Sequence, residues 1–110
     1  PYESDLVFDV RVLPNPHFVQ ELKPLTGQDL PVADYLLGFP QTRAFLEKIV
    51  DFIRFALPLY IQEGKAYLTI AIGCTGGQHR SVFIAEELAK TLRLDGYEVS
   101  VRHRDIGKEV

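Results

Sequence analysis

The residues with the clearest chemical signature form a glycine-rich polar run at positions 73–81, Gly-Cys-Thr-Gly-Gly-Gln-His-Arg-Ser. An apolar, β-like run (Tyr67–Ile72) precedes it, and a helix-like pattern begins near Gln78. Glycines let backbone N–H groups converge on a ligand, and a helix dipole favours negative charge at its N-terminus. Arg80 adds a guanidinium suited to phosphate. The run therefore predicts an anion site; the alternative is a βα turn in which the glycines only reverse the chain.

Other polar residues follow the predicted strands, and all three histidines of the chain are among them. Near neutral pH a histidine can donate to an anion or move a proton. The candidate anion-binding residues are Asn15, His17, Cys74, Thr75, Gly76, Gly77, Gln78, His79, Arg80, Ser81 and Arg104. The candidate supporting residues are Asp9, Arg11, Arg102 and His103. Asp9 is the candidate ion-pair partner of Arg11, and no metal site is predicted.

Cys74 offers an enzymatic alternative. The spacing Cys74-x5-Arg80-Ser81 matches the phosphate loop of cysteine phosphatases, and a thiol beside an arginine at a helix N-terminus ionises readily. Against this, Gly73 stands where such enzymes carry a histidine, and only Asp29 and Asp34 are candidates for the general acid. The leading interpretation therefore has no catalytic residue in this domain.

The elements that must position these residues alternate between strand and helix patterns. The predicted elements are a strand at Leu6–Leu13, a short helix at Val32–Leu37, a helix from its N-cap Thr42 to about Tyr60, a strand at Tyr67–Ile72, a helix from Gln78 to Asp95, and a strand at Tyr97–Arg102. This βαβαβ order favours a small, three-layer-like α/β fold with a right-handed parallel sheet. Ligand crevices in such sheets lie at the carboxyl ends of the strands, so the polar clusters are expected to converge there. Pro58 is expected to kink or end the longest helix.

Composition limits the classes of function. The 110 residues, 46% of them hydrophobic, predict one domain with a real core. A formal net charge of −3 gives no whole-chain reason to expect nucleic acid. One cysteine and no long apolar run predict a cytoplasmic protein without a membrane span. Because the chain begins at Pro1 and lacks methionine, we expect residues 1–110 to be a single domain excised from a longer protein.

Four segments carry a resemblance to a known family: Phe8–His17, Thr26-Gly27, Ala71–Val82 and Arg102–Arg104. Together they resemble the C-terminal domain of the RapZ family, bacterial P-loop nucleotide-binding proteins also described as RNase adapters. The resemblance covers nearly the whole chain, and its Pro-Asn-Pro-His and Gly-Cys-Thr-Gly-Gly-x-His-Arg-Ser-Val blocks are long and specific.

The resemblance implies a regulatory role. Full-length members pair this domain with an N-terminal domain that binds ATP or GTP, which implies no cofactor for the region in hand. The best-known enterobacterial member senses glucosamine-6-phosphate through this domain and presents a small RNA to an RNase. The expected ligand is thus an amino-sugar phosphate, with RNA and an RNase or a signalling protein as further partners and a homo-oligomer as the full-length assembly.

Two departures weaken the expectation of RNA binding. Gln78 stands where RNA-binding relatives carry lysine, and the tail at 105–110 is not basic as theirs is. Affinity for a nucleic-acid backbone depends on the number of phosphates neutralised, so we expect weak, salt-sensitive RNA binding. The remaining alternatives are the cysteine-dependent phosphatase and an oligomerisation domain whose glycine loop only turns the chain.

Overall fold

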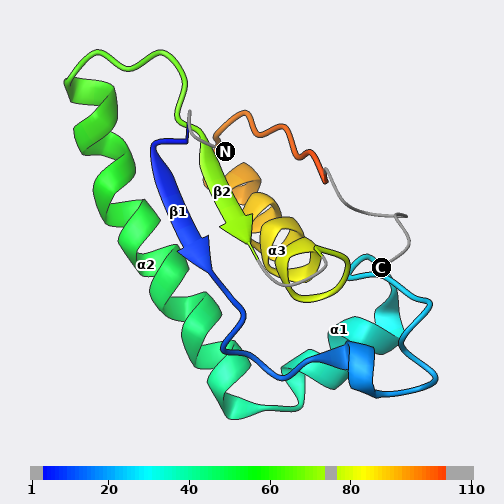
Figure 1. Ribbon diagram of the computed structural model, residues 1–110. Coiled ribbons are helices and arrows are strands. Elements are labelled where there is room, and N and C mark those ends of the chain that lie inside the picture. The colour runs from blue at the N-terminus through cyan, green and yellow to red at the C-terminus, as the bar shows by residue number, and fades with distance from the viewer. Residues whose placement is uncertain (1–3, 74–76, 104–110) are drawn as a thin grey trace.

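The computed structural model describes residues 4–73 and 77–103 as a mixed α/β fold (Figure 1). Its elements, in chain order, are β1 (Leu6–Asp9), the 3-10 helix η1 (Pro16–Phe18), α1 (Leu30–Leu37), α2 (Pro40–Gln62), β2 (Ile70–Gly73) and α3 (Arg80–Leu94). The two strands pair in parallel, with Leu6 opposite Ile70 and Asp9 opposite Gly73. Of the described residues, these strands alone form the sheet.

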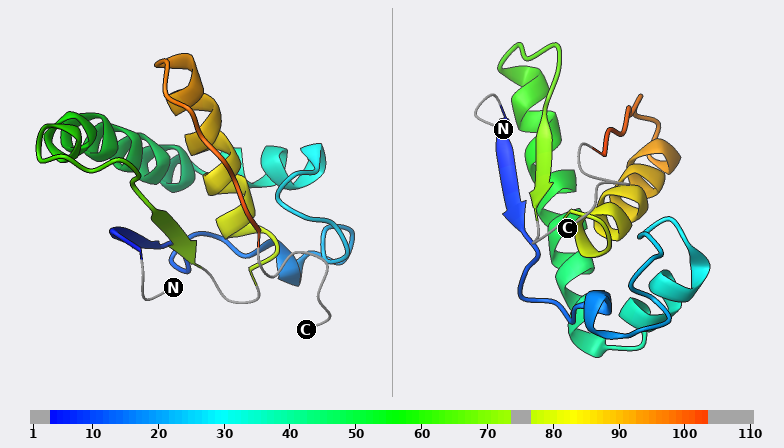
Figure 2. Two further views of the ribbon diagram at one scale, coloured as in Figure 1. Left: turned by 90° about the horizontal axis from the view of Figure 1, so that it is seen from above. Right: turned by 45° about the vertical axis from the view of Figure 1, so that its right-hand side comes forward.

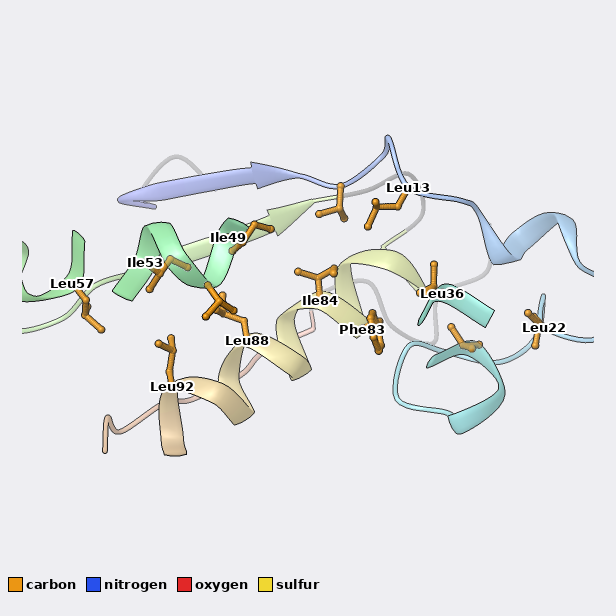
Figure 3. Packing of buried hydrophobic residues seen from close by; sticks show 13 residues of the cluster. Leu13, Leu22, Leu36, Ile49, Ile53, Leu57, Phe83, Ile84, Leu88 and Leu92 are labelled. Carbon is orange, nitrogen blue, oxygen red and sulfur yellow. The ribbon is translucent and has the colours of Figure 1, made fainter. Parts of the chain in front are cut away.

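All three α-helices lie on the same side of the sheet, as the left view of Figure 2 shows. Burial in β1 alternates accordingly: Leu6 and Phe8 are half-buried, whereas Val7 and Asp9 are exposed. The core fills the space between sheet and helices (Figure 3). Its main members are Val10 and Leu13 after β1, Val32 and Leu36 of α1, Ile49, Ile53 and Leu57 of α2, and Phe83, Ile84, Leu88 and Leu92 of α3. These apolar side chains recur at helical spacing, which is why the helices form and pack as they do.

The longest helix differs from the prediction at both ends. It begins at Pro40, with Phe39 as N-cap, so the prediction of Thr42 as N-cap is wrong. Proline suits a first helical position because its fixed φ is helical and its missing N–H has no intrahelical partner there. Thr42 is instead fully buried in the first turn, and its Oγ1 has no hydrogen-bond partner within residues 4–73 and 77–103. Pro58 does not end the helix, which continues to Gln62.

The predicted strand Leu6–Leu13 is too long. It ends at Asp9, because the Asp9 carboxylate accepts from the Arg11 backbone N–H at 3.0 Å and turns the chain. The next backbone bond, Leu13 N to Val10 O at 3.1 Å, belongs to the same turn. The second strand likewise begins at Ile70 rather than at Tyr67.

The predicted third strand, Tyr97–Arg102, does not join the sheet in the described part of the chain. The segment turns back beside α3 (Figure 1), and Arg93 donates to the Val99 carbonyl at 2.8 Å. Tyr97 and Val99 pack on the core and alternate with exposed residues. The alternation of apolar and polar residues that predicted a strand therefore arises because one side of this segment packs on the core and the other side faces solvent. The described elements thus form a two-stranded parallel sheet covered on one face by three helices, and the full βαβαβ order is not observed.

None of the helices in residues 4–73 and 77–103 is long and apolar enough to span a membrane.

Candidate functional site

Both strands end at the same edge, which we call the carboxyl edge. Asp9 and Gly73 lie opposite each other there, and Val10 N donates to Gly73 O at 2.8 Å. Gly73 opens the glycine-rich loop, and α3 begins at Arg80 after it. This is the position at which open α/β sheets bind ligands.

Arg80 fixes the N-terminus of α3 to the segment that follows β1. Its side chain is only 4% exposed, and its Nη1 donates to the carbonyls of Arg11 at 2.7 Å and Leu13 at 3.1 Å. Both acceptors are neutral, so the guanidinium charge remains at the carboxyl edge. Arg80 therefore joins the start of α3 to the segment after β1 through two backbone carbonyls, whereas the predicted convergence of the polar side chains in one pocket stays a prediction.

The predicted Asp9–Arg11 ion pair is present. Arg11 Nη2 lies 2.7 Å from Asp9 Oδ2, and the pair is exposed. Hydrogen bonds from the Arg11 side chain and backbone, with a smaller effect of the Arg80 charge, hold the pKa of Asp9 below its ordinary value. The two guanidiniums exceed the one carboxylate by one positive charge, so this corner of the edge is cationic at neutral pH.

The N-terminus of α3 retains a field that favours anions. His79 is its N-cap residue, and within the described part of the chain its side chain makes no capping bond to the first turn, which carries no acidic residue. The positive end of the helix dipole therefore has no acidic side chain of the first turn beside it, which favours an anion there. Gly77 has a φ of 64°, a left-handed conformation that suits glycine as the chain enters the helix.

The side chains of Gln78 and His79 point to the loop before α1. Gln78 Nε2 donates to the Leu25 carbonyl at 2.7 Å and to the Lys23 carbonyl at 3.1 Å. His79 Nε2 lies 3.0 Å from the Leu22 carbonyl, which can only accept, so this nitrogen carries the proton. Burial of the ring lowers the pKa of His79. Both side chains thus hold a loop, and a role for them in ligand binding stays a prediction.

Gly27 is a residue whose importance sequence reasoning missed. Its N–H donates to Gln78 O at 2.9 Å, and a Cβ there would lie 2.3 Å from Phe83 N and 2.4 Å from His79 O. Only glycine allows the loop to approach the first turn of α3 this closely. The signal in the sequence, Thr26-Gly27, indicates a turn but does not reveal the close approach.

Asn15 and His17 lie in the η1 region. Asn15 Oδ1 accepts from His17 N at 3.1 Å and so caps η1. The His17 ring lies edge-on to Phe18, with 5.8 Å between ring centroids, and lines an open depression of about 650 Å³ with Phe18, Gln20 and Lys23. Burial is the main cause of the lowered pKa of His79, and the charge of His17 adds to it.

His103 is held by α3 rather than by a third strand. Its Nε2 donates to Glu86 Oε2 at 2.6 Å, and Gln28 Nε2 donates to the same oxygen at 3.2 Å. The bond from His103 is the main reason why the pKa of Glu86 is lowered. This cluster joins the loop before α1, α3 and the segment after it.

The other predicted residues have varied positions. Ser81 is buried in the first turn of α3, and Arg102 is exposed. Cys74, Thr75, Gly76 and Arg104 lie outside the described residues, so their predicted roles stay predictions. No group of three or more histidine, cysteine, aspartate or glutamate residues in the described part of the chain could hold a metal ion.

A sequence model described as the RapZ C-terminal domain matches residues 1–107 of the chain. The chain belongs to the RapZ C-terminal domain family. The resemblance seen in the sequence is thereby confirmed.

Curated relatives of this RapZ-type domain are named nucleotide-binding proteins. One from Acidobacterium capsulatum is 58% identical over 106 residues, which is 96% of the chain and 34% of that protein. One from Koribacter versatilis is 57% identical over 98% of the chain and 35% of its own length. One from Bacillus cytotoxicus is 58% identical over 98% of the chain and 36% of its own length. The chain therefore spans about a third of the length of these relatives.

Proposed function

We propose that this domain is a regulatory sensor that binds a phosphorylated small molecule at the carboxyl edge, and that the ligand is an amino-sugar phosphate such as glucosamine-6-phosphate. The observation that carries the proposal is the buried Arg80 at the N-terminus of α3, whose first turn has no acidic residue. A helix N-terminus and a desolvated guanidinium both stabilise a phosphate, and here they lie at the edge where parallel sheets bind ligands.

The charges at the edge support a dianionic group rather than a neutral one. Arg11 and Arg80 outnumber Asp9, and the first turn of α3 has no acidic side chain that would repel phosphate. The two carbonyl bonds of Arg80 use one terminal nitrogen, whereas a guanidinium has five N–H donors. The glycine-rich loop supplies backbone donors in the same proposal.

The sugar would occupy the depression lined by His17. An imidazole and the amide of Gln20 suit hydroxyl groups, and the aromatic face of Phe18 suits the apolar face of a sugar ring. Phosphate on the loop and sugar against η1 together would let the domain distinguish a sugar phosphate from free phosphate. The proposal that this sugar carries an amino group rests on the resemblance to the RapZ family.

The names of the relatives refer to nucleotides, which carry phosphate groups. They are called nucleotide-binding proteins, and the present chain has no Gly-x4-Gly-Lys-[Ser/Thr] motif. We therefore assign ATP or GTP binding to the two thirds of the relatives that lie outside this region. RNA and an RNase or signalling partner remain part of the same proposal for the longer protein.

Calorimetry with glucosamine-6-phosphate and glucosamine tests the proposal directly. We expect the phosphorylated sugar to bind about 10- to 150-fold more tightly, the equivalent of about 1.5–3 kcal/mol for hydrogen bonds to a charged group. Arg80→Ala should remove a similar factor, provided that circular dichroism shows a folded variant. Equal affinity for the two sugars would refute phosphate recognition.

Arg43→Ala is the matched control. Arg43 also donates to a backbone carbonyl, that of Leu37 at 2.7 Å, but it lies at the start of α2 and is exposed. It should leave the affinity for glucosamine-6-phosphate unchanged. An equal loss in both arginine variants would indicate a general effect of losing a cation.

The phosphatase alternative has its own test. Hydrolysis of an aryl phosphate that disappears in Cys74→Ser would establish an enzyme. For a sensor we expect no turnover, and Cys74→Ser should retain most of the affinity because backbone donors hold the phosphate.

A further inference from the structure

The flank of α2 beside β1 carries apolar side chains that nothing in the described residues covers. Phe52, Phe55 and Leu59 are 45%, 69% and 51% exposed, and their spacing places them in one stripe along the helix. We call this stripe, together with the outer edge of β1, the β1–α2 flank.

Two contacts fix which side of α2 the stripe occupies. The Phe52 ring lies edge-on to Phe8 of β1, with 6.3 Å between centroids, so the stripe begins at the strand. Arg54 points to the opposite side, where it pairs with Asp95 at the end of α3 at 2.8 Å. Figure 1 shows the same arrangement: α2 reaches past β1 on the side away from β2.

The strand next to the stripe is also incomplete. Leu6 and Val10 donate their N–H groups to carbonyls of the β2 strand region, so by alternation the N–H groups of Val7 and Asp9 point away from β2. Val7 stands at an exposed position of the alternating burial along β1 and is 66% exposed. Parallel strands are almost always covered on both faces, so a sheet like this one is expected to gain a cover.

We propose that the β1–α2 flank is the docking surface for the remainder of the longer protein, the part that makes up about two thirds of each relative. The length of chain outside this region argues for that occupant. Because that part is covalently connected to this domain, it meets the flank at an effective concentration of about a millimolar. Even a small apolar stripe can then be covered by an intramolecular contact, which does not depend on protein concentration. A phenylalanine-rich centre with a polar rim, here Lys48 and Asp51, is the usual anatomy of such a contact.

Hydroxyl-radical footprinting tests the proposal, because it measures exposure of individual side chains. The probe proteins are the 110-residue chain and a chimera in which it replaces the matching third of the Acidobacterium capsulatum protein. We expect oxidation of Phe55 and Leu59 to fall at least fivefold in the chimera. Leu94, 83% exposed at the end of α3, serves as the internal control and should be oxidised equally in both.

Two variants of the chimera sharpen the test. Phe55→Glu should return Phe52 and Leu59 to their rates in the isolated chain, whereas Leu94→Glu should leave their protection intact. If the chimera does not fold, the unaltered Acidobacterium capsulatum protein and its excised matching third provide the same comparison at the helix aligned with α2.

Two results would overturn the proposal. Equal oxidation of Phe55 and Leu59 in both proteins would show that the flank stays open. Protection in the isolated chain that grows with concentration, together with a dimer in sedimentation, would assign the flank to a second copy. Both readouts are independent of sugar-phosphate binding, so failure here is distinguishable from failure of the proposed function.

Discussion

Gly27→Ala should destabilise the fold more than its single added carbon suggests. The new Cβ would lie 2.3 Å from Phe83 N, 2.4 Å from His79 O and 2.9 Å from the Val82 Cβ. Two of these neighbours are backbone atoms of a helix, and each distance falls well short of the van der Waals separation of about 3.5 Å. The loop must therefore move away from α3 by about 1 Å.

That movement removes more than packing. It stretches the bond from Gly27 N to Gln78 O, now 2.9 Å, which is worth about 1 kcal/mol. Overpacking itself costs about 1–3 kcal/mol. The free energy of unfolding should therefore fall by about 2–4 kcal/mol. In urea this corresponds to a midpoint lower by about 1–3 M.

Gly73→Ala is the control for this experiment. Among the described residues, a Cβ at Gly73 meets no heavy atom within 4 Å, and the φ of Gly73 lies in the ordinary range. Its free energy of unfolding should stay within about 0.5 kcal/mol of the unmodified chain. If the two alanine variants unfold at the same urea concentration, the close approach of the loop to α3 does not exist as described.

Three further predictions concern the polar contacts. Burial lowers the pKa of His79, so the unfolded chain takes up a proton on this residue at a higher pH than the folded chain does. The free energy of unfolding should therefore fall as the pH drops below about 6.5. In urea titrations from pH 7.5 to 5, the free energy of unfolding of His79→Gln should decline less steeply than that of the unmodified chain. Glu86→Gln should weaken the hydrogen bond to His103, lower the free energy of unfolding by about 1 kcal/mol and speed amide hydrogen exchange at 97–103. Glu87→Gln removes an exposed ion pair with Lys90 and should change neither quantity. Arg80→Lys should lower the urea midpoint despite keeping the charge, because an ammonium lacks the planar fork that holds its two carbonyls; an unchanged midpoint would contradict this role.

Several elements were predictable because their signals are local. The strand–glycine–helix order at 70–94 follows from an apolar run, glycines and helical periodicity, and the pairing of Asp9 with Arg11 follows from their proximity in the chain.

The rest depends on contacts between distant segments. No local pattern shows that Arg80 donates to carbonyls beyond β1, or that Gln78 and His79 hold the loop at 22–25. The alternation at 97–103 has the strand period but arises from packing on α3, and periodicity alone cannot distinguish the two. Proline at the first position of α2 outweighs the N-cap preference of Thr42 because φ is already fixed there.

The parallel pairing of β1 with β2 also determines the order in which the molecule can assemble. The partners lie at residues 6–9 and 70–73, so no hairpin can form first, and the 23-residue α2 must be in place before the strands meet. Contacts within a helix form early because they close short loops. Pairing of β1 with β2 closes a long loop and therefore has a larger entropic cost. We therefore expect the carboxyl edge, and the ligand site proposed there, to be the last part to form. Substitutions in β1 should accordingly speed unfolding more than they slow folding.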